Sequence, residues 1–308
     1  MDTIGISFKT IAIAVLLSFS ILISVYFYDE LRHTTRVVFC DVGQGDGAYI
    51  RTADKIDIVV DAGPTKAILT CLGRYMPFYD HTIELAFLSH PQKDHYGAYE
   101  SVLDRYTIKN FIVPPVSNPA HSFTVLREKL LKEKTAIRYL YAGDTINLKN
   151  IHIAFFWPER QFFLDHTFQN TNNSDSTANF FDPIGDLNDF SQIFVLTDKK
   201  TKILFTGDAS PLVLGIVSKK FSEQSPASID ILKVPHHGSK NGLTSDFLRL
   251  ADPTLSVISV GKNNSYGHPS KEIIDIFKAL NKKYIRTDEK GDVVIEIGER
   301  GWKVKNKI

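Results

Sequence analysis

The chain has 308 residues, of which 43% are hydrophobic and 23% charged, which is the composition of a folded protein large enough for one large domain or two small ones. The formal net charge of +1 excludes a strongly basic or acidic protein, so the overall charge gives no indication of a nucleic-acid partner. The two cysteines, Cys40 and Cys71, follow no metal-ligand spacing, and we expect two buried thiols rather than a disulfide.

The first notable segment, residues 10–28, contains no charged side chain. A helix of this length covers about 28 Å, close to the hydrocarbon thickness of a bilayer. No Ala-x-Ala site follows, which argues against a cleaved signal peptide. We expect residues 1–9 to form a short tail, residues 10–28 a transmembrane signal-anchor helix and residues 29–35 a linker. Lys9 favours a cytoplasmic N-terminus, so the domain at 36–308 is expected outside the cytoplasm on a single-pass protein of the cell membrane.

Beyond the linker, short apolar runs predict strands and longer segments between them predict helices. The predicted strands cover 36–40, 47–51, 56–61, 83–88, 108–113, 137–141, 151–157, 192–197, 202–205, 229–234, 255–260, 293–297 and 302–304. The predicted helices cover 65–76, 96–106, 122–134, 245–250 and 270–280, and another begins near residue 210. Residues 159–189 are polar and aperiodic, which is typical of a functional or mobile loop. Two β-rich halves with helices outside predict an α+β fold, a four-layer αβ/βα sandwich.

Half of the ten histidines, together with two aspartates, lie in four short segments, residues 89–95, 206–208, 235–239 and 266–269. Imidazole and carboxylate together suit divalent zinc or manganese. A single histidine at a strand end, or a single Gly-Asp turn, is usually an ordinary structural residue. The chain order and the shared position of these segments after predicted strands indicate a metal site instead.

Several longer motifs follow one another between residues 37 and 297. They are Asp41-Val-Gly-Gln-Gly-Asp46, Asp61-Ala-Gly63, Ser89-His-Pro-x-x-Asp-His95, Thr206-Gly-Asp208, Leu232-Lys-Val-Pro-His-His-Gly-Ser239, Ser259-Val-Gly261, Tyr266-Gly-His-Pro269 and Arg286-Thr-Asp288. In this order the set resembles the metallo-β-lactamase-fold hydrolases, and more specifically the extracellular domain of ComEC-type competence proteins.

The resemblance implies a centre of two divalent ions, zinc or manganese, which can turn water into a nucleophile at neutral pH. Asp208 is the expected bridge between the ions. Asp94 and His268 are the expected catalytic groups, with His268 either a further ligand or the group that protonates the leaving oxygen. Ser239, Lys240 and Asn264 are candidate phosphate contacts. The expected metal ligands are His90, Asp94, His95, Asp208, His236 and His237.

Two features depart from the family pattern. Gln92 stands where the competence branch usually has aspartate, and a neutral amide is a weaker ligand than a carboxylate. We therefore expect one of the two ions to be held loosely. ComEC-type proteins also carry a multi-helix membrane channel, which the single apolar segment of this sequence cannot form.

The expected function is a membrane-anchored, metal-dependent phosphodiesterase, with nuclease action on DNA as one form of it, and no protein partner is predicted. A first alternative is an extracellular hydrolase of small phosphoesters, such as phosphorylcholine esters, which the near-neutral charge and the aromatic segment 159–189 favour. A second is a non-catalytic binding module with a decayed metal site, for which Gln92 would be the first sign. A true β-lactamase is not expected, because no clear histidine ligand lies between His95 and Asp208.

Overall fold

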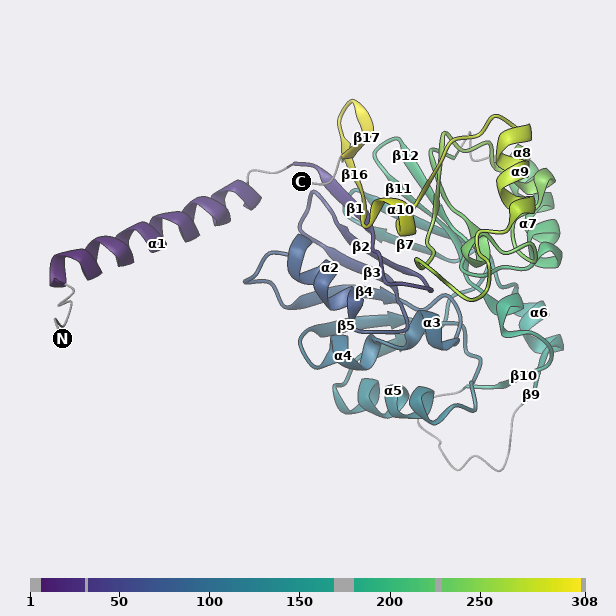
Figure 1. The fold of residues 1–308 in the computed structure, drawn as a ribbon. Helices are drawn as coiled ribbons and strands as arrows, with labels where there is room; N and C mark the ends of the chain where they lie inside the picture. The colour runs from purple at the N-terminus through teal and green to yellow at the C-terminus, as the bar shows by residue number, and fades with distance from the viewer. Residues whose placement is uncertain (1–6, 31–32, 169–179, 225–228, 306–308) are drawn as a thin grey trace.

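The structure, a computed structural model, describes residues 7–30, 33–168, 180–224 and 229–305. Two β-sheets of eight and seven strands pack face to face, and helices cover both outer faces (Figure 1). One core cluster lies between the two sheets. A second lies between the eight-stranded sheet and its helices, and a third lies between the seven-stranded sheet and its helices. The predicted four-layer αβ/βα sandwich is therefore confirmed.

The eight-stranded sheet has the order β17-β16-β1-β2-β3-β4-β5-β6, and its strands β3 to β6 are parallel. Helices α2 (Ala67–Tyr75), α4 (Tyr99–Leu103) and α5 (His121–Lys132) supply buried side chains to its outer core. The strands are β1 Thr35–Phe39, β2 Gly47–Arg51, β3 Asp57–Ala62, β4 Thr82–Phe87, β5 Thr107–Ile112, β6 Ala136–Arg138, β16 Val293–Gly298 and β17 Gly301–Lys305.

The seven-stranded sheet has the order β15-β14-β13-β12-β11-β8-β7, with β12 to β15 parallel. Helices α7 (Pro211–Gln224), α8 (Ser245–Ala251) and α9 (Lys271–Ala279) cover it. The strands β7 and β15 were not predicted, because they are short and only partly buried and so carry no apolar run. The strands are β7 Thr145–Leu148, β8 Ile151–Trp157, β11 Ile193–Asp198, β12 Thr201–Phe205, β13 Ile231–Lys233, β14 Leu255–Ile258 and β15 Tyr284–Arg286.

Aromatic side chains fill the space between the sheets. Phe87 on β4 stacks against Phe194 on β11 with ring centroids 4.9 Å apart, and Phe194 stacks on Phe205 of β12 at 5.1 Å. All three side chains are buried, and each aromatic residue buries a large apolar area. This packing fixes β4 against β12, the two strands that lead into the first two histidine and aspartate motifs.

The predicted loop 159–189 contains short elements in its described part, and residues 169–179 lie outside the described residues. The remaining short elements of the fold are α3 Lys93–Tyr96, α6 Arg160–Asp165, β9 Thr167–Phe168, β10 Asp182–Pro183, η1 Leu187–Phe190, η2 Pro235–Gly238 and α10 Thr287–Lys290.

The helix predicted over 96–106 is wrong in its extent, since two short helices, α3 and α4, replace it. The backbone N–H of Ala98 donates to the carbonyl of Gly63 at 3.0 Å, and the carbonyl of Asp94 accepts the N–H of Asp46 at 3.2 Å. Tertiary hydrogen bonds thus take the two groups that would pair in a continuous helix. Gly45 permits this approach, because a Cβ there would lie 2.3 Å from the Asp94 carbonyl oxygen.

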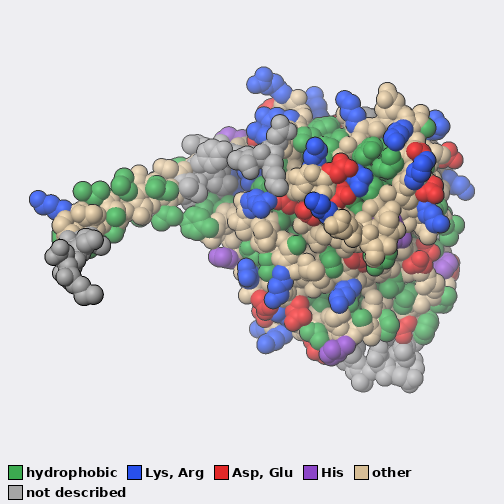
Figure 2. All heavy atoms as spheres, in the orientation of Figure 1, with side chains coloured by type: hydrophobic (Ala, Val, Ile, Leu, Met, Phe, Trp, Pro, Cys, Tyr) green, Lys and Arg blue, Asp and Glu red, His purple; other side chains and the backbone are tan. Residues whose placement is uncertain are grey.

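The predicted N-terminal helix is present as α1, Phe8–Glu30, and lies apart from the sandwich (Figure 1). Its hydrophobic side chains are exposed, as Figure 2 shows, with Leu16 67% and Ile21 63% accessible. The prediction that it spans a bilayer gains no support. Among the residues that the structure describes, no helix has both the length and the apolar character needed to cross a membrane.

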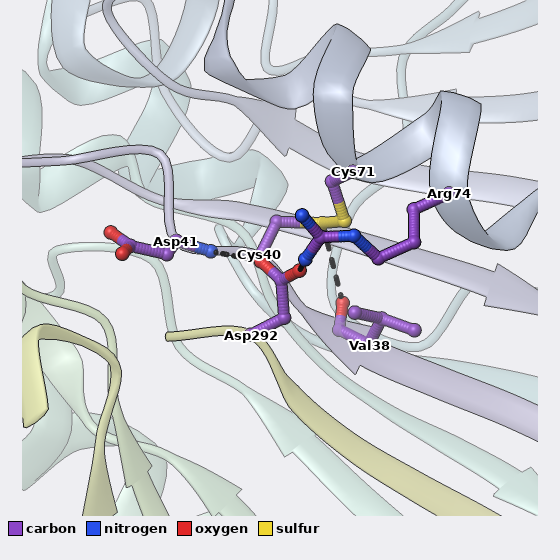
Figure 3. The surroundings of a disulfide bond; sticks show 6 residues. All are labelled: Val38, Cys40, Asp41, Cys71, Arg74 and Asp292. Carbon is purple, nitrogen blue, oxygen red and sulfur yellow. Dashed lines mark hydrogen bonds and ion pairs between the residues drawn. A yellow bond between two sulfur atoms is a disulfide. The ribbon is translucent and has the colours of Figure 1, made fainter. Parts of the chain in front are cut away.

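The prediction of two free thiols is wrong, because Cys40 and Cys71 form a disulfide with their Cα atoms 6.0 Å apart (Figure 3). Cys40 follows β1 and Cys71 lies in α2, which returns over the end of that strand. Beside the disulfide, Arg74 contacts Asp292 at 2.5 Å, and Asp292 accepts the backbone N–H of Asp41 at 2.9 Å. The cross-link and this ion pair together hold the start of the turn that follows β1.

Candidate metal centre

The candidate ligands follow strands that end at one edge of each sheet. His90 to His95 follow β4, Asp208 follows β12, and His236 and His237 follow β13. Within each sheet these strands run parallel to their neighbours, so their carboxyl ends lie together. Packing of the two sheets then brings both sets of turns to one place.

Four of the six predicted ligands converge there: Asp94, His95, Asp208 and His237, with the ligand atoms all within 4.8 Å of one another. The Nε2 atom of His95 lies 3.3 Å from Asp208 Oδ1. The Nε2 atom of His237 lies 3.3 Å from Asp208 Oδ2 and 3.4 Å from Asp94 Oδ2. The two imidazoles and two carboxylates therefore face one point.

These spacings are compatible with ligands of a divalent ion. With metal–ligand bonds of about 2.0–2.1 Å, two ligand atoms of a tetrahedral site lie about 3.3–3.4 Å apart. The three distances just given are of this size, and Asp208 presents a different oxygen to each histidine. Two histidines with two carboxylates are also a donor set that zinc and manganese accept.

Unpaired polar atoms support the same fit. The Nε2 atoms of His95 and His237 and the Oδ1 atom of Asp208 are buried without a hydrogen-bond partner among the described residues. Such atoms are rare in folded proteins, because burying them unpaired is costly. Four carboxylates surround this point, those of Asp46, Asp61, Asp94 and Asp208. Among the described residues, the one buried ammonium there is that of Lys233. With neutral histidines and ionised carboxylates, the group would carry three more negative than positive charges. A divalent cation would satisfy the atoms and reduce the charge.

The outer nitrogens of the two central histidines are fixed by carboxylates. The Nδ1 atom of His95 lies 3.0 Å from Asp61 Oδ2. The Nδ1 atom of His237 lies 3.2 Å from Asp46 Oδ1 and 3.1 Å from the Ser259 carbonyl oxygen. A carboxylate on Nδ1 leaves Nε2 free for a metal, which is the usual arrangement around metal-binding histidines.

The backbone at the double histidine is unusual. His236 and His237 have φ values of 51° and 53°, and Gly238 follows at 77°. Left-handed conformations are uncommon for residues with a side chain and cluster at functional sites. The turn is held in place by the N–H of His236, which donates to the Gly207 carbonyl at 3.2 Å. It turns His237 inward while His236 stays at the cleft.

The surrounding carboxylates favour protonated imidazoles at the two central histidines, His95 and His237. Burial lowers the pKa of His95, but Asp208 and Asp61 outweigh it and raise the pKa well above its usual value. For His237, Asp208 and Asp46 likewise outweigh burial and raise the pKa. Burial raises the pKa of Asp208, but His237 and His95 lower it well below the usual range. A cation would therefore have to displace protons from the two imidazoles.

His90 and His236 lie beside the converged set rather than in it. The ring of His90 is 4.2 Å from that of His95, and its buried Nε2 has no partner among the described residues. Burial, and then the charge of His95, lower the pKa of His90 to about 3, so its imidazole is neutral. The Nε2 atom of His236 lies 3.8 Å from Asp208 Oδ2. The imidazole of His236 thus lies near Asp208, and that of His90 lies against His95.

A cleft of about 340 Å³ opens over this group. His268 lies in its wall, with its ring 5.8 Å from that of His236 and stacked on the exposed ring of Tyr266. Burial, and then the charges of His237 and His236, lower the pKa of His268. The lining residues are Gln44, Pro64, Gln92, Lys93, Asp94, His236, His237, Tyr266 and His268.

Comparison with known proteins agrees with this architecture. No protein-family model matches the chain. It is 24% identical over 303 residues to ComE operon protein 3 of Bacillus subtilis, covering 89% of this chain and 34% of that protein. It is 24% identical over 266 residues to Recombination protein 2 of Haemophilus influenzae, covering 85% and 28%. The metallo-β-lactamase-fold protein YhfI of Bacillus subtilis superposes with a TM-score of 0.53 at 14% identity, covering 85% of this chain and 99% of YhfI.

The chain has the metallo-β-lactamase fold and is similar in sequence to ComEC-type competence proteins. It spans about a third of the length of these curated relatives. Igni18, a metallo hydrolase of the archaeon Ignicoccus hospitalis, superposes with a TM-score of 0.51 at 14% identity, covering 84% of this chain and 98% of Igni18. CmlA, a diiron β-hydroxylase of Streptomyces venezuelae, superposes at 0.50 with 11% identity, covering 83% and 53%. Because one fold carries both chemistries, the reaction of this chain has to be argued from its site.

The three predicted phosphate contacts do not line the cleft. Ser239 is buried, and its hydroxyl accepts the N–H of Asn241 at 3.2 Å. Lys240 is exposed. The side chain of Asn264 bonds its own loop, donating to the carbonyls of Gly261 and His268 and accepting the N–H of His268. Asn264 thus shapes the loop that presents His268.

Sequence reasoning assigned no role to Asp61 or Lys233, although both lie in motifs that carried the resemblance. The sequence context of each residue could have indicated a role. Asp61 is a carboxylate at the end of the apolar strand β3, and Lys233 is a charged residue in the apolar strand β13. A charged side chain in a fully buried strand needs a partner. Asp46, which ends the glycine-rich motif, contacts His237.

Proposed function

We propose that this protein is a metal-dependent phosphodiesterase that acts on DNA. The observation that carries the proposal is the convergence of Asp94, His95, Asp208 and His237, with ligand atoms within 4.8 Å of one another, beside an open cleft that Asp94 and His237 line. A bound divalent ion supplies an activated water and neutralises charge on the phosphoryl oxygens. Similarity to competence proteins supports a nucleic-acid substrate.

We propose two metal positions that differ in affinity. The four converged residues would hold a tightly bound zinc or manganese ion. His90, Gln92 and His236 would hold a second ion, and they would hold it more weakly because the amide of Gln92 carries no charge. The unpaired Nε2 of His90 and the Nε2 of His236, 3.8 Å from Asp208 Oδ2, support this second position.

Residues of the cleft wall would position the substrate. Lys93 lies exposed beside Asp94 and offers an ammonium to a phosphate oxygen. The ring of Tyr266, 71% exposed, offers a surface on which a base can stack. His268, whose lowered pKa favours the neutral imidazole, is suited to accept a proton or to bind a cation. Asp94 would act both as ligand and as a polar contact at the cleft floor.

The size of the cleft favours a second candidate, a small phosphodiester such as a phosphorylcholine ester. A volume of about 340 Å³ is near the lower end for small-molecule pockets. The purified full-length chain should therefore be assayed with single-stranded DNA, bis-p-nitrophenyl phosphate and p-nitrophenyl phosphorylcholine, each with manganese and with zinc. Cleavage of DNA supports the first proposal, and cleavage of the choline ester alone supports the second. No turnover on any substrate, together with little bound metal, would support the binding-module alternative.

We also propose that α1 anchors the protein in the cell membrane with residues 36–308 outside the cytoplasm. The exposed apolar side chains of α1 support anchoring. The Cys40–Cys71 disulfide supports the location, because disulfides persist mainly in oxidising compartments. Carbonate extraction should leave the protein in the membrane pellet, and protease added to spheroplasts should digest it. Release into the soluble fraction would contradict the anchor, and protection from protease would contradict the location.

A further inference from the structure

Lys233 lies at the end of β13, beneath the candidate metal centre, with 3% of its surface accessible. Lysine is almost never this buried unless its charge is paired. Its Nζ donates to the Gly207 carbonyl at 3.1 Å, forms an ion pair with Asp46, and lies 3.9 Å from Asp208 Oδ1. The ammonium therefore touches, at once, the turn that carries Asp208 and a carboxylate from the opposite sheet.

Asp46 connects this ammonium to the other side of the centre. One oxygen of its carboxylate pairs with Lys233, and the other lies 3.2 Å from His237 Nδ1. The carboxylate of Asp46 thus lies between the ammonium of Lys233 and the ring of His237, whose Nε2 points toward Asp94 and Asp208.

We infer that Lys233 is a positioning residue that, through Gly207 and Asp46, holds Asp208 and His237 in place for a divalent cation. This inference rests on the proposed metal centre and deepens it. Lys233 would not contact the cation. Its positive charge would offset part of the repulsion between the carboxylates of Asp46 and Asp208. The ligands would therefore keep their spacing before the cation binds.

Two variants test the pair. Lys233→Met keeps most of the volume and removes the charge, and Asp46→Asn keeps the shape and removes the carboxylate. Each should lower zinc affinity about 10- to 100-fold, as is usual when a group that orients a ligand is lost. The double variant should lose about as much as one single variant, because the two residues act as a unit. Lys233→Arg should recover part of the affinity.

The measurements are chelator competition for zinc and the visible absorption spectrum of the cobalt(II)-loaded full-length protein, neither of which requires turnover. A matched control is Arg51→Met, which removes another buried pair, that of Arg51 with Asp57, at the opposite end of β2. It should lower thermal stability and leave zinc affinity and the cobalt spectrum unchanged. If Lys233→Met does not fold, Lys233→Gln, which keeps a polar side chain without the charge, takes its place in the same measurements.

The outcomes separate this inference from the proposed function. Failure of the wild-type protein to bind zinc or cobalt would overturn the metal centre itself. Wild-type binding with unchanged affinity and spectrum in Lys233→Met and Asp46→Asn would overturn only the role of Lys233. A double variant whose loss is the product of both single losses would show that the two residues act separately, and would also overturn it.

Discussion

Reduction of the Cys40–Cys71 disulfide should destabilise the folded domain by a calculable amount. The bond joins residues 31 apart in the sequence. In the chain-entropy description, closing a loop of this length removes unfolded-state entropy worth about 3.7 kcal/mol at 25 °C. For a domain of this size, 1 kcal/mol shifts the melting temperature by about 2–4 °C, so we expect a fall of about 7–15 °C on reduction.

The assay compares thermal unfolding of the oxidised protein with that of protein refolded in a reductant, after thiol counting by mass spectrometry. Comparing two redox states of one sequence leaves the core packing unchanged, which a cysteine substitution would not. The double variant Cys40→Ala with Cys71→Ala serves as control, since its melting temperature should not respond to reductant. Equal melting temperatures in both redox states, or two free thiols per chain in native oxidised protein, would refute the reasoning.

Three further predictions concern the metal centre. Asp208→Ala should abolish metal-dependent turnover and most metal binding, because Asp208 faces both central histidines. Full metal content of this variant by elemental analysis would show that Asp208 is not a ligand. Gln92→Asp should raise the metal affinity of the weaker position roughly tenfold, about 1–2 kcal/mol, in chelator competition, because a charged ligand replaces a neutral one. An unchanged affinity would mean that Gln92 does not face the cation. Zinc affinity should rise as pH increases, because the raised pKa values of His95 and His237 mean that protons must leave before the metal binds, and pH-independent affinity without proton release would count against this.

The sequence was sufficient for the features that depend on local patterns. Apolar runs predicted most strands of both sheets, and the histidine segments predicted four residues that the structure brings to one point. These features follow from periodicity and from residues at strand ends, which a linear sequence displays directly.

Features that depend on how distant segments pack could not be predicted in this way. The pairing of Cys40 with Cys71 requires α2 to return over β1, and no local pattern fixes that. The break in the helix predicted over 96–106 comes from hydrogen bonds with Gly63 and Asp46. The role of Lys233 depends on the opposite sheet, because its partner Asp46 follows β1. In each case the deciding partner is remote in the chain.

The most direct test of the central claim is a crystal structure of the zinc-loaded protein with anomalous scattering measured at the zinc edge. We predict a strong anomalous peak about 2.0–2.2 Å from Nε2 of His95 and of His237 and from the carboxylates of Asp94 and Asp208. Absence of a peak among these four residues, in crystals grown with excess zinc, would contradict the account.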